Sequence, residues 1–435
     1  MTLALLAFLF AEPDWTSIER HAVDLLQRYV RIQSVNPPAD AREAAALFEA
    51  ELKQGGLEPR RFVSQPETGK VNLVVRLPGR DRSKKPLLLL NHFDVVPVDR
   101  AAWGSIDPFG GEIKDGAIWG RGTLDMKGIG IMHLVALTTL KRAGITPSRD
   151  IVMLTTPDEE TNGTYGVVWM AQNHFPEIDA EYVLDEGGMG TRDVFSPGKL
   201  VFGVAVGEKQ VAWIRVRAKG TAGHGSQPIP DNANERLISA LARALDAPAR
   251  GRVHPVVDEM RRSLGGALAS NKYVNAIQKN TLSLTTLRAG VGEPLKANVI
   301  PSAAEATIDC RLLPGVNAEE FVSEMRARIN DPNVTVELIS TPNDPGASNH
   351  KTPLFEAISR AILRYHPSAT VTPIIVPHGT DSVKLRMRGL TAYGLTPMVL
   401  DLATAGTMHS DQERIPVEEF KKGLRIMFDV LRSEF

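Results

Sequence analysis

Short apolar runs alternate with segments of helical periodicity along most of this chain, and that alternation constrains the fold more than any other feature. VNLVVRLPG at 71–79, PLLLLNHFDVV at 86–96 and DIVMLTTPDEE at 150–160 have the length and composition of buried strands. A helical pattern, GIGIMHLVALTTLKRAG, occupies 128–144. Strands that alternate with helices form parallel sheets covered by helices. The sequence therefore predicts an α/β fold with a mostly parallel sheet flanked by helices.

A central stretch of the chain has a different pattern. QVAWIRVRAKG at 210–220 alternates apolar and polar residues with period two, which is typical of a half-buried antiparallel strand. Further β-rich segments and two helical patterns follow it. We predict an inserted α+β domain at 208–343, with a four-stranded antiparallel sheet and two helices, that acts as a lid or dimerisation domain. The catalytic domain would then consist of 13–207 and 344–435.

The overall composition excludes several classes of partner and site. Fifty Lys and Arg residues against 51 Asp and Glu give a net charge of −1, so we expect no nucleic-acid partner. The only cysteine is Cys310, so neither an intrachain disulfide nor a thiolate metal cluster can form. Cys310 is predicted to be a packed thiol. Any metal ion must be held by His, Asp and Glu.

The first residues resemble a targeting segment. TLALLAFLFA at 2–11 has the length of a signal-peptide hydrophobic region and is too short to span a bilayer. It is preceded by no Lys or Arg, which is atypical of such signals, whereas the change to EPDW after Ala11 resembles a cleavage neighbourhood. We interpret 1–12 as a leader that favours export to the periplasm or beyond. The alternatives are a hydrophobic first strand or a disordered leader of a cytoplasmic protein; no membrane span is predicted.

Polar residues stand at the end of the first long apolar run. His92 and Asp94 follow four leucines and are two positions apart, so on a strand they point to the same face, and Asp94 can orient the imidazole. A structural histidine is the alternative. In IWGRGTLDMKGIG, glycines at 120, 122 and 128 let the backbone turn and present Asp125 at a helix start, where an N-cap is the alternative role.

Carboxylates follow two more apolar runs. Glu159 and Glu160 lie in TTPDEETNG, Glu186 lies in LDEGG, and His409 lies in a loop of small residues near the C-terminus. Adjacent carboxylates repel one another, so after a buried strand they indicate a bound cation; a solvated surface is the alternative. Because ligands gather at the carboxyl ends of parallel strands, these groups are expected to meet. Histidines with carboxylates suit zinc, or manganese and cobalt, and an aspartate that bridged two ions would complete a co-catalytic hydrolase site.

The motifs of the chain resemble, in order, those of a known enzyme family. They are HFDVVP, GRGTLDMKG, DEET, LDEGG, GTAGHGSQP, NVIP, IDCRLLP, GTDS and HSDQERI, and they extend from about residue 20 to about residue 420. They are similar to those of the co-catalytic zinc peptidases and deacylases, which include aminoacylase, carboxypeptidase S, bacterial glutamate carboxypeptidase and succinyl-diaminopimelate desuccinylase. LDEGG and the nearby GEK favour the aminoacylase and carboxypeptidase S side of that family.

The resemblance implies two zinc ions per chain, with Co²⁺ or Mn²⁺ as substitutes. His92 and Glu186 would be the terminal ligands of one ion. Glu160 and His409 would hold the other ion, and Asp125 would bridge the two.

The resemblance also implies the roles of neighbouring groups. Glu159 would be the general base that takes a proton from water and returns it to the leaving nitrogen. Asp185 is the alternative to Glu186 as a ligand. The peptide bond after Asp125 is at a place where this family uses a non-proline cis bond.

Three residues of the inserted domain match family positions. His224 of GTAGHGSQP would reach the active site of a partner subunit and stabilise the oxyanion, which implies a homodimer through the inserted domain. Asn298 and Arg311 would lie on the substrate side, the arginine being suited to a substrate carboxylate. The alternatives are a surface histidine and an arginine on an exposed strand face.

The predicted function is that of a zinc-dependent hydrolase. It would cleave an amide or peptide bond next to a free carboxylate, as an exopeptidase of the carboxypeptidase or dipeptidase type, through metal-activated water and a Glu base. An N-acyl-amino-acid deacylase that uses the same site is the alternative. Two more distant alternatives are a non-catalytic binding protein and a carbamoyl-transfer or other metal-free enzyme on the same fold.

Overall fold

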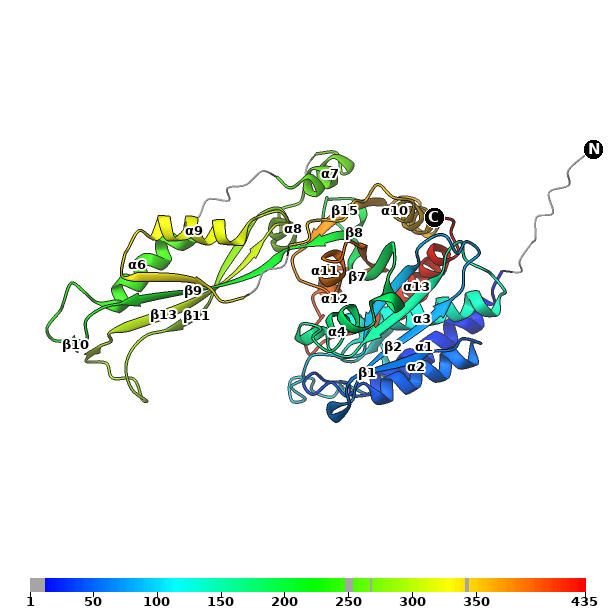
Figure 1. The fold of residues 1–435 in the computed structure, drawn as a ribbon, viewed down its shortest axis with the longest axis horizontal. Helices are drawn as coiled ribbons and strands as arrows, with labels where there is room; N and C mark the ends of the chain where they lie inside the picture. Colours follow the sequence, from blue (N-terminus) through cyan, green and yellow to red (C-terminus); the bar gives the residue numbers. More distant parts are fainter. Residues whose placement is uncertain (1–11, 247–252, 267, 341–343) are drawn as a thin grey trace, which may run out of the picture.

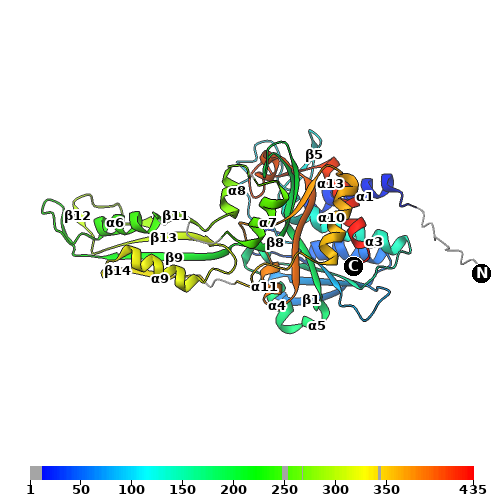
Figure 2. The ribbon, with the colours of Figure 1, turned by 90° about the horizontal axis from the view of Figure 1, so that it is seen from above.

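A computed structural model of the chain describes residues 12–246, 253–266, 268–340 and 344–435. Figures 1 and 2 show a large helix-covered sheet with an elongated arm extending from one side. The predicted leader lies, except for Glu12, outside the described residues. Within the described part of the chain, no helix is both long and apolar enough to cross a membrane. The predicted fold class is confirmed.

The large sheet has eight strands in the order β1-β2-β6-β3-β7-β16-β8-β15. The four neighbours β6, β3, β7 and β16 are parallel, and so are β8 and β15. The carboxyl ends of the central strands therefore share one edge. The strands are β1 (Arg60–Gln65), β2 (Lys70–Leu77), β3 (Leu87–His92), β6 (Ile151–Thr156), β7 (Tyr182–Arg192), β8 (Leu200–Glu208), β15 (Thr370–Val376) and β16 (Thr391–Val399).

Helices cover both faces of this sheet. One face packs against α1 (Trp15–Arg31), α2 (Arg42–Gln54), α3 (Gly128–Arg142), α10 (Pro353–Tyr365) and α13 (Val417–Leu431), and the other against α4 (Val167–Asn173), α5 (Phe175–Ile178) and α11 (Ser382–Arg386). The four consecutive leucines of β3 point alternately to the two faces of the sheet. Leu87 and Leu89 pack with the helices of the first face, and Leu88 and Leu90 pack with those of the second face. A strand buried on both faces is apolar at every position.

The arm contains a four-stranded antiparallel sheet in the order β11-β13-β9-β14. Its strands are β9 (Gln210–Lys219), β11 (Thr281–Arg288), β13 (Ala303–Leu312) and β14 (Val334–Leu338). Helices α6 (Ala233–Leu245) and α9 (Ala318–Ile329) cover one face, and the other, called here the open face, carries no helix of the described residues. A short ribbon of β10 (Gly223–His224) and β12 (Val299–Ile300) lies at the free end of the arm (Figure 1). We call this arm, β9 to β14 with α6 and α9, the lid.

Two helices between α6 and β11 belong to the large domain instead. α7 (Pro255–Ser263) and α8 (Lys272–Ile277) pack against β8 and β15 in a separate apolar cluster. Val257 and Met260 of α7 join Ile374 and Val376 of β15 there. The stretch 208–343 thus supplies both the lid and a cover for the edge of the large sheet, because the apolar side of α7 is buried against β15.

Candidate metal centre and active site

His92 is held at the carboxyl end of β3 with both ring nitrogens directed. Its Nδ1 lies 2.9 Å from the backbone carbonyl oxygen of Asp94 and 3.4 Å from Asp94 Oδ1. Its Nε2 lies 3.2 Å from Asp125 Oδ1 and 3.6 Å from Glu186 Oε1. A proton on Nδ1 that is donated to Asp94 leaves the Nε2 lone pair available to a cation.

Asp125 presents its two carboxylate oxygens to two different histidines. Oδ1 faces His92, and Oδ2 lies 3.0 Å from His409 Nε2. Asp125 lies in the segment η2 (Thr123–Lys127), directly before α3, and its bond to Met126 is cis, as the resemblance implied. This arrangement is the one that a carboxylate bridging two cations requires.

Glu160 and His409 form the second half of the cluster. His409 Nε2 is 3.4 Å from Glu160 Oε1, an oxygen that is buried and accepts no hydrogen bond from the described residues. Asp94 also positions this acidic loop, because its carboxylate accepts hydrogen bonds from the backbone N–H groups of Glu159 at 3.1 Å and Glu160 at 3.2 Å. One aspartate therefore orients the end of β3 and the loop after β6.

The two acids of LDEGG point in opposite directions, as neighbours on a strand do. Glu186 faces His92, whereas Asp185 accepts hydrogen bonds from the backbone N–H of Ser382 at 3.2 Å and its hydroxyl at 2.7 Å. Glu159 joins Glu186 and His92, with potential ligand atoms of all three within 4.8 Å of one another. The geometry thus brings Glu186, and not Asp185, beside His92 and Glu159 in a group of side chains that could hold a metal ion.

Burial and close contact shift the pKa values of the cluster's acids and histidines. Burial raises the pKa of Glu159 well above its usual value, and the charge of Glu186 raises it further. Burial alone would lower the pKa of His92, but hydrogen bonds to its carboxylate neighbours outweigh burial and hold that pKa well above 6.5. The nearby carboxylates of Asp125 and Glu160 raise the pKa of His409 to about 10. Cations bound among these groups would relieve the repulsion between the carboxylates.

A buried ion pair that sequence reasoning missed supports the cluster. Arg121 Nη1 donates to Glu413 Oε2 at 2.6 Å, and Arg121 Nη2 donates to the His409 carbonyl at 3.2 Å. Glu413 Oε1 accepts from the backbone N–H groups of Leu124 at 2.9 Å and Asp125 at 3.3 Å. The pair therefore ties the Asp125 segment to the His409 loop. The available signal was that Arg121 lies in GRGTLDMKG and Glu413 in HSDQERI, although their pairing across 292 positions is not visible in either motif.

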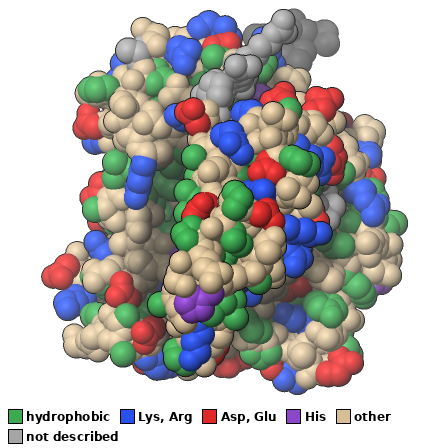
Figure 3. Space-filling view, turned by 90° about the vertical axis from the view of Figure 1, so that its left-hand side faces the viewer, with side chains coloured by type: hydrophobic (Ala, Val, Ile, Leu, Met, Phe, Trp, Pro, Cys, Tyr) green, Lys and Arg blue, Asp and Glu red, His purple; other side chains and the backbone are tan. Residues whose placement is uncertain are grey.

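The lid residues divide into two groups. His224 Nε2 is 3.4 Å from Asn298 Nδ2, and both residues are exposed at the free end of the lid, on the far side of the arm from the large sheet (Figure 1). Figure 3 views the molecule from that side, and a histidine side chain lies on the surface facing the viewer. The structure does not bring this pair to the cluster of its own chain. Arg311, by contrast, lines one pocket together with Glu159.

Two histidines and several carboxylates at the carboxyl edge of a mostly parallel sheet define the class of metal-dependent hydrolases. The sequence signature of Peptidase family M20/M25/M40 matches residues 88–433, and the chain belongs to this family. It is accordingly an enzyme of the metallopeptidase and amidohydrolase type, as predicted. The chain is 31% identical to Aminoacylase-1B of Rattus norvegicus over 417 residues, 94% of each chain. It is 28% identical to the probable carboxypeptidase S-like 2 of Dictyostelium discoideum over 389 residues, 83% of this chain and 74% of the relative.

Solved structures share the fold. An M20 family metallo-carboxypeptidase from Sulfolobus solfataricus superposes with a TM-score of 0.71 at 16% identity, covering 94% of this chain and 98% of that one. Human carnosine dipeptidase 1 gives a TM-score of 0.64 at 18% identity, covering 96% and 97%. The likeness extends over both the large sheet and the lid, since nearly the whole chain is covered.

Proposed function

We propose that the protein is a dizinc hydrolase that cleaves an amide or peptide bond next to a free carboxylate in a small peptide. The observation that carries the proposal is the position of Asp125, with one carboxylate oxygen toward His92 and the other toward His409. Deacylation of an N-acyl amino acid at the same site is a second candidate. The 31% identity to an aminoacylase over nearly the whole chain favours it.

The residues present fit two zinc ions. His92 and Glu186 would hold one ion, Glu160 and His409 would hold the other, and Asp125 would contact both. The raised pKa of Glu186, which is caused by burial and then by the charge of Asp125, and the unpartnered buried oxygen of Glu160 both indicate places for cations. Imidazole and carboxylate are ligands that zinc accepts.

The chain itself supplies the proton transfer. When bound, the zinc ions would polarise the substrate carbonyl and the attacking water. Glu159 would accept the proton from that water and deliver it to the leaving nitrogen. Burial raises its pKa, which brings a carboxylate toward the range of a useful base, and the hydrogen bond from its backbone N–H to Asp94 fixes its loop.

Arg311 supplies a docking point for the substrate carboxylate. Its Nε and Nη2 donate to the two oxygens of Asp309 at 2.8 and 3.1 Å, which fixes the guanidinium plane. The Nη1 end then remains for a substrate carboxylate in the pocket that contains Glu159. This pairing explains the expected preference for a bond next to a free carboxylate.

We further propose a homodimer in which the lid of one subunit completes the site of the other. His224 and Asn298 are adjacent, exposed and remote from the cluster of their own chain, so they could donate to an oxyanion only in a partner copy. β11 is an edge strand of the lid sheet, with β13 as its one neighbour among the described strands. A strand edge of this kind pairs readily with a second chain.

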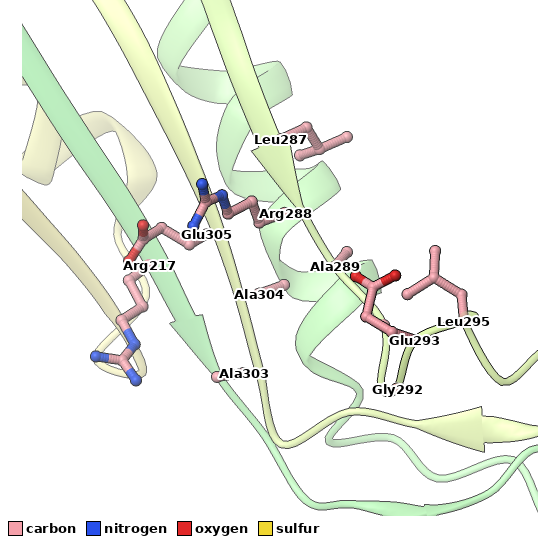
Figure 4. A pocket seen from close by; sticks show the side chains of 11 residues that line it. Arg217, Leu287, Arg288, Ala289, Gly292, Glu293, Leu295, Ala303, Ala304 and Glu305 are labelled. Atoms are coloured by element: carbon pink, nitrogen blue, oxygen red, sulfur yellow. The ribbon is translucent and has the colours of Figure 1, made fainter.

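Apolar side chains around β11 support the same interface. Leu284 and Leu287 on β11 are 41% and 56% exposed, Leu295 on the following loop is 66% exposed, and Ile238 on the adjacent α6 is 64% exposed. Figure 4 shows Leu287 and Leu295 on the side of β11 that faces away from β9 and β13. A hollow of about 880 Å³ lies beside them, lined by Arg217, Arg288 and Glu305. A second copy would cover this surface.

Activity with a defined substrate panel tests the proposal. Metal-stripped protein would be loaded with zinc, cobalt or manganese and assayed with dipeptides and N-acetyl amino acids, each in free and carboxyl-amidated form. We expect metal-dependent hydrolysis of the free acids and little of the amides. Faster turnover of N-acetyl amino acids would select the deacylase, and no hydrolysis with any metal would refute the function.

Export is a separate proposal that rests on residues 2–11. We expect the mature protein from its native host to begin after Ala11 and to fractionate outside the cytoplasm. N-terminal sequencing of that material is the test, and an intact Met1 would contradict it.

A further inference from the structure

A tryptophan is exposed beside the proposed carboxylate docking point. Trp213 on β9 is 46% exposed, although its side chain is among the largest and most apolar in the chain. In the lid sheet Trp213 lies directly opposite Asp309, and Val211 lies opposite Arg311. Residues directly opposite on antiparallel strands share a face. The open face of the lid therefore presents Trp213, Val211 and Arg311 side by side at the end nearest the large domain.

These residues line a pocket between the lid and the large domain. The pocket has a volume of about 480 Å³, and the large domain contributes Glu159, Asn162, Val383 and Lys384 to its wall. A volume of this order holds a small ligand. The pocket thus combines the proposed base, the carboxylate docking point and an apolar surface made by Trp213 with two valines.

The charges in the pocket argue against a second acidic group on the substrate. Arg311 accounts for one carboxylate. Lys209 also lines the pocket, but its ammonium donates to the Ala276 carbonyl at 3.0 Å and to the Lys279 carbonyl and the Thr281 hydroxyl at 2.8 Å each. An ammonium group has three N–H donors, so Lys209 has none left.

One cation of the pocket wall remains, and carboxyl groups lie in the same wall. Lys384 lines the pocket together with Asp381, which is buried. The wall therefore offers a substrate side chain more apolar surface than positive charge.

We propose that Trp213 determines specificity by packing against the side chain of the substrate residue that carries the free carboxylate. The enzyme would prefer substrates in which this residue is large and apolar. The inference rests on the proposed function, because it takes Arg311 as the carboxylate site and Glu159 as the base. A hydrophobic contact of this size discriminates by about 10- to 200-fold.

Binding to an inactive enzyme tests the inference separately from catalysis. Zinc-loaded Glu159→Gln protein would be titrated calorimetrically with N-acetyl-L-phenylalanine, N-acetyl-L-alanine and N-acetyl-L-glutamate. We expect the phenylalanine compound to bind most tightly. Adding Trp213→Ala should weaken that binding by about tenfold or more while the alanine compound changes by less than about threefold. Trp213→Phe should retain most of the preference.

Lys384→Ala removes the remaining cation of the same pocket wall and tests whether that cation attracts an acidic substrate. Arg360→Ala, on the exposed surface of α10, is the control and should leave the binding of all three compounds unchanged. Tighter binding of the glutamate compound that is lost in Lys384→Ala would overturn the inference, and so would an equal loss for all three compounds in Trp213→Ala. Thermal melts check that the variants are folded. Selective binding by the Glu159→Gln protein, combined with no hydrolysis by the native enzyme, would refute the proposed function but not the binding preference that we assign to Trp213.

Discussion

Two histidines of this chain lie in contrasting surroundings. His92 is 1% exposed, and both of its ring nitrogens face carboxylate or carbonyl oxygens of the same chain. His224 is exposed at the free end of the lid, and its hydrogen-bond partners are Ser226 and Asn298. The first histidine belongs to a cluster that its own chain orients completely. The second histidine forms a pair with Asn298 that lies far from the His92 cluster of its own chain. The difference teaches that one chain orients the His92 cluster by itself but leaves the His224 pair remote from it, which is why we propose that a second subunit brings the two together.

Substitution of the proposed base, Glu159, should give the largest loss of activity. Glu159→Gln removes the proton acceptor but keeps the size of the side chain, so kcat should fall by about 10³- to 10⁴-fold while two zinc ions per chain remain bound. Steady-state kinetics and elemental analysis measure the two quantities. Glu356→Gln, on the exposed surface of α10, is the control and should change neither. Turnover retained in Glu159→Gln would remove this residue from the mechanism.

The lid pair should give the next largest effect, without loss of metal. His224→Ala should lower kcat by about 10²- to 10³-fold, the range for loss of an oxyanion donor, with zinc content unchanged. Mixing this variant with Glu159→Gln should restore about one quarter of native activity, because half of the random dimers are mixed and each has one complete site. No recovery on mixing would contradict action across subunits.

Asp94 should affect metal affinity more modestly, since it orients ligands without being one. Asp94→Asn removes the carboxylate charge 3.4 Å from His92 Nδ1 and one of the two oxygens that accept from the backbone N–H groups of Glu159 and Glu160, so zinc affinity should fall by about 10- to 100-fold. Chelator competition gives the affinity. Asn36→Ala, which removes one hydrogen bond to Asp94 Oδ2 at 2.7 Å, should give a smaller change. An equal or larger loss in Asn36→Ala would contradict the ranking.

The pH dependence of zinc affinity should be the smallest of these effects for each pH unit. His409 is protonated in the metal-free protein up to its raised pKa of about 10, so zinc must displace that proton. Zinc affinity should therefore rise between pH 6.5 and 10, by at most about tenfold per unit for this proton. The interaction of protonated His409 with the carboxylates of Asp125 and Glu160 stabilises the metal-free fold fully below pH 6.5. This contribution to stability is lost as the pH rises through about 10.

Zinc titrations and thermal melts at pH 6.5, 7.5 and 8.5 measure this dependence. The stabilisation by zinc should increase along the series. A metal affinity that is independent of pH would contradict the assignment of His409 as a ligand.

The sequence predicted the parts of the molecule that local patterns encode. The four leucines of β3 predicted a strand buried on both faces, and the period of two in β9 predicted the half-exposed lid sheet. The polar residues after strands predicted the position of the cluster, because parallel strands end at one edge. The family resemblance predicted the cis bond after Asp125.

The parts that sequence did not predict depend on contacts between distant segments. Arg121 and Glu413 are 292 positions apart, and nothing in either motif indicates that they pair. The packing of α7 on β15 was hidden because its amphipathic pattern would suit either domain. The pocket that joins Trp213 to Glu159 exists only where the lid meets the large domain.

The central claim is that Asp125 bridges two cations between His92 and His409. Anomalous diffraction from crystals of the zinc-loaded enzyme, collected above and below the zinc edge, tests it most directly. Two peaks about 3.5–4 Å apart, one on each side of the Asp125 carboxylate, are the predicted result. A single peak, or peaks away from Asp125, would contradict the account.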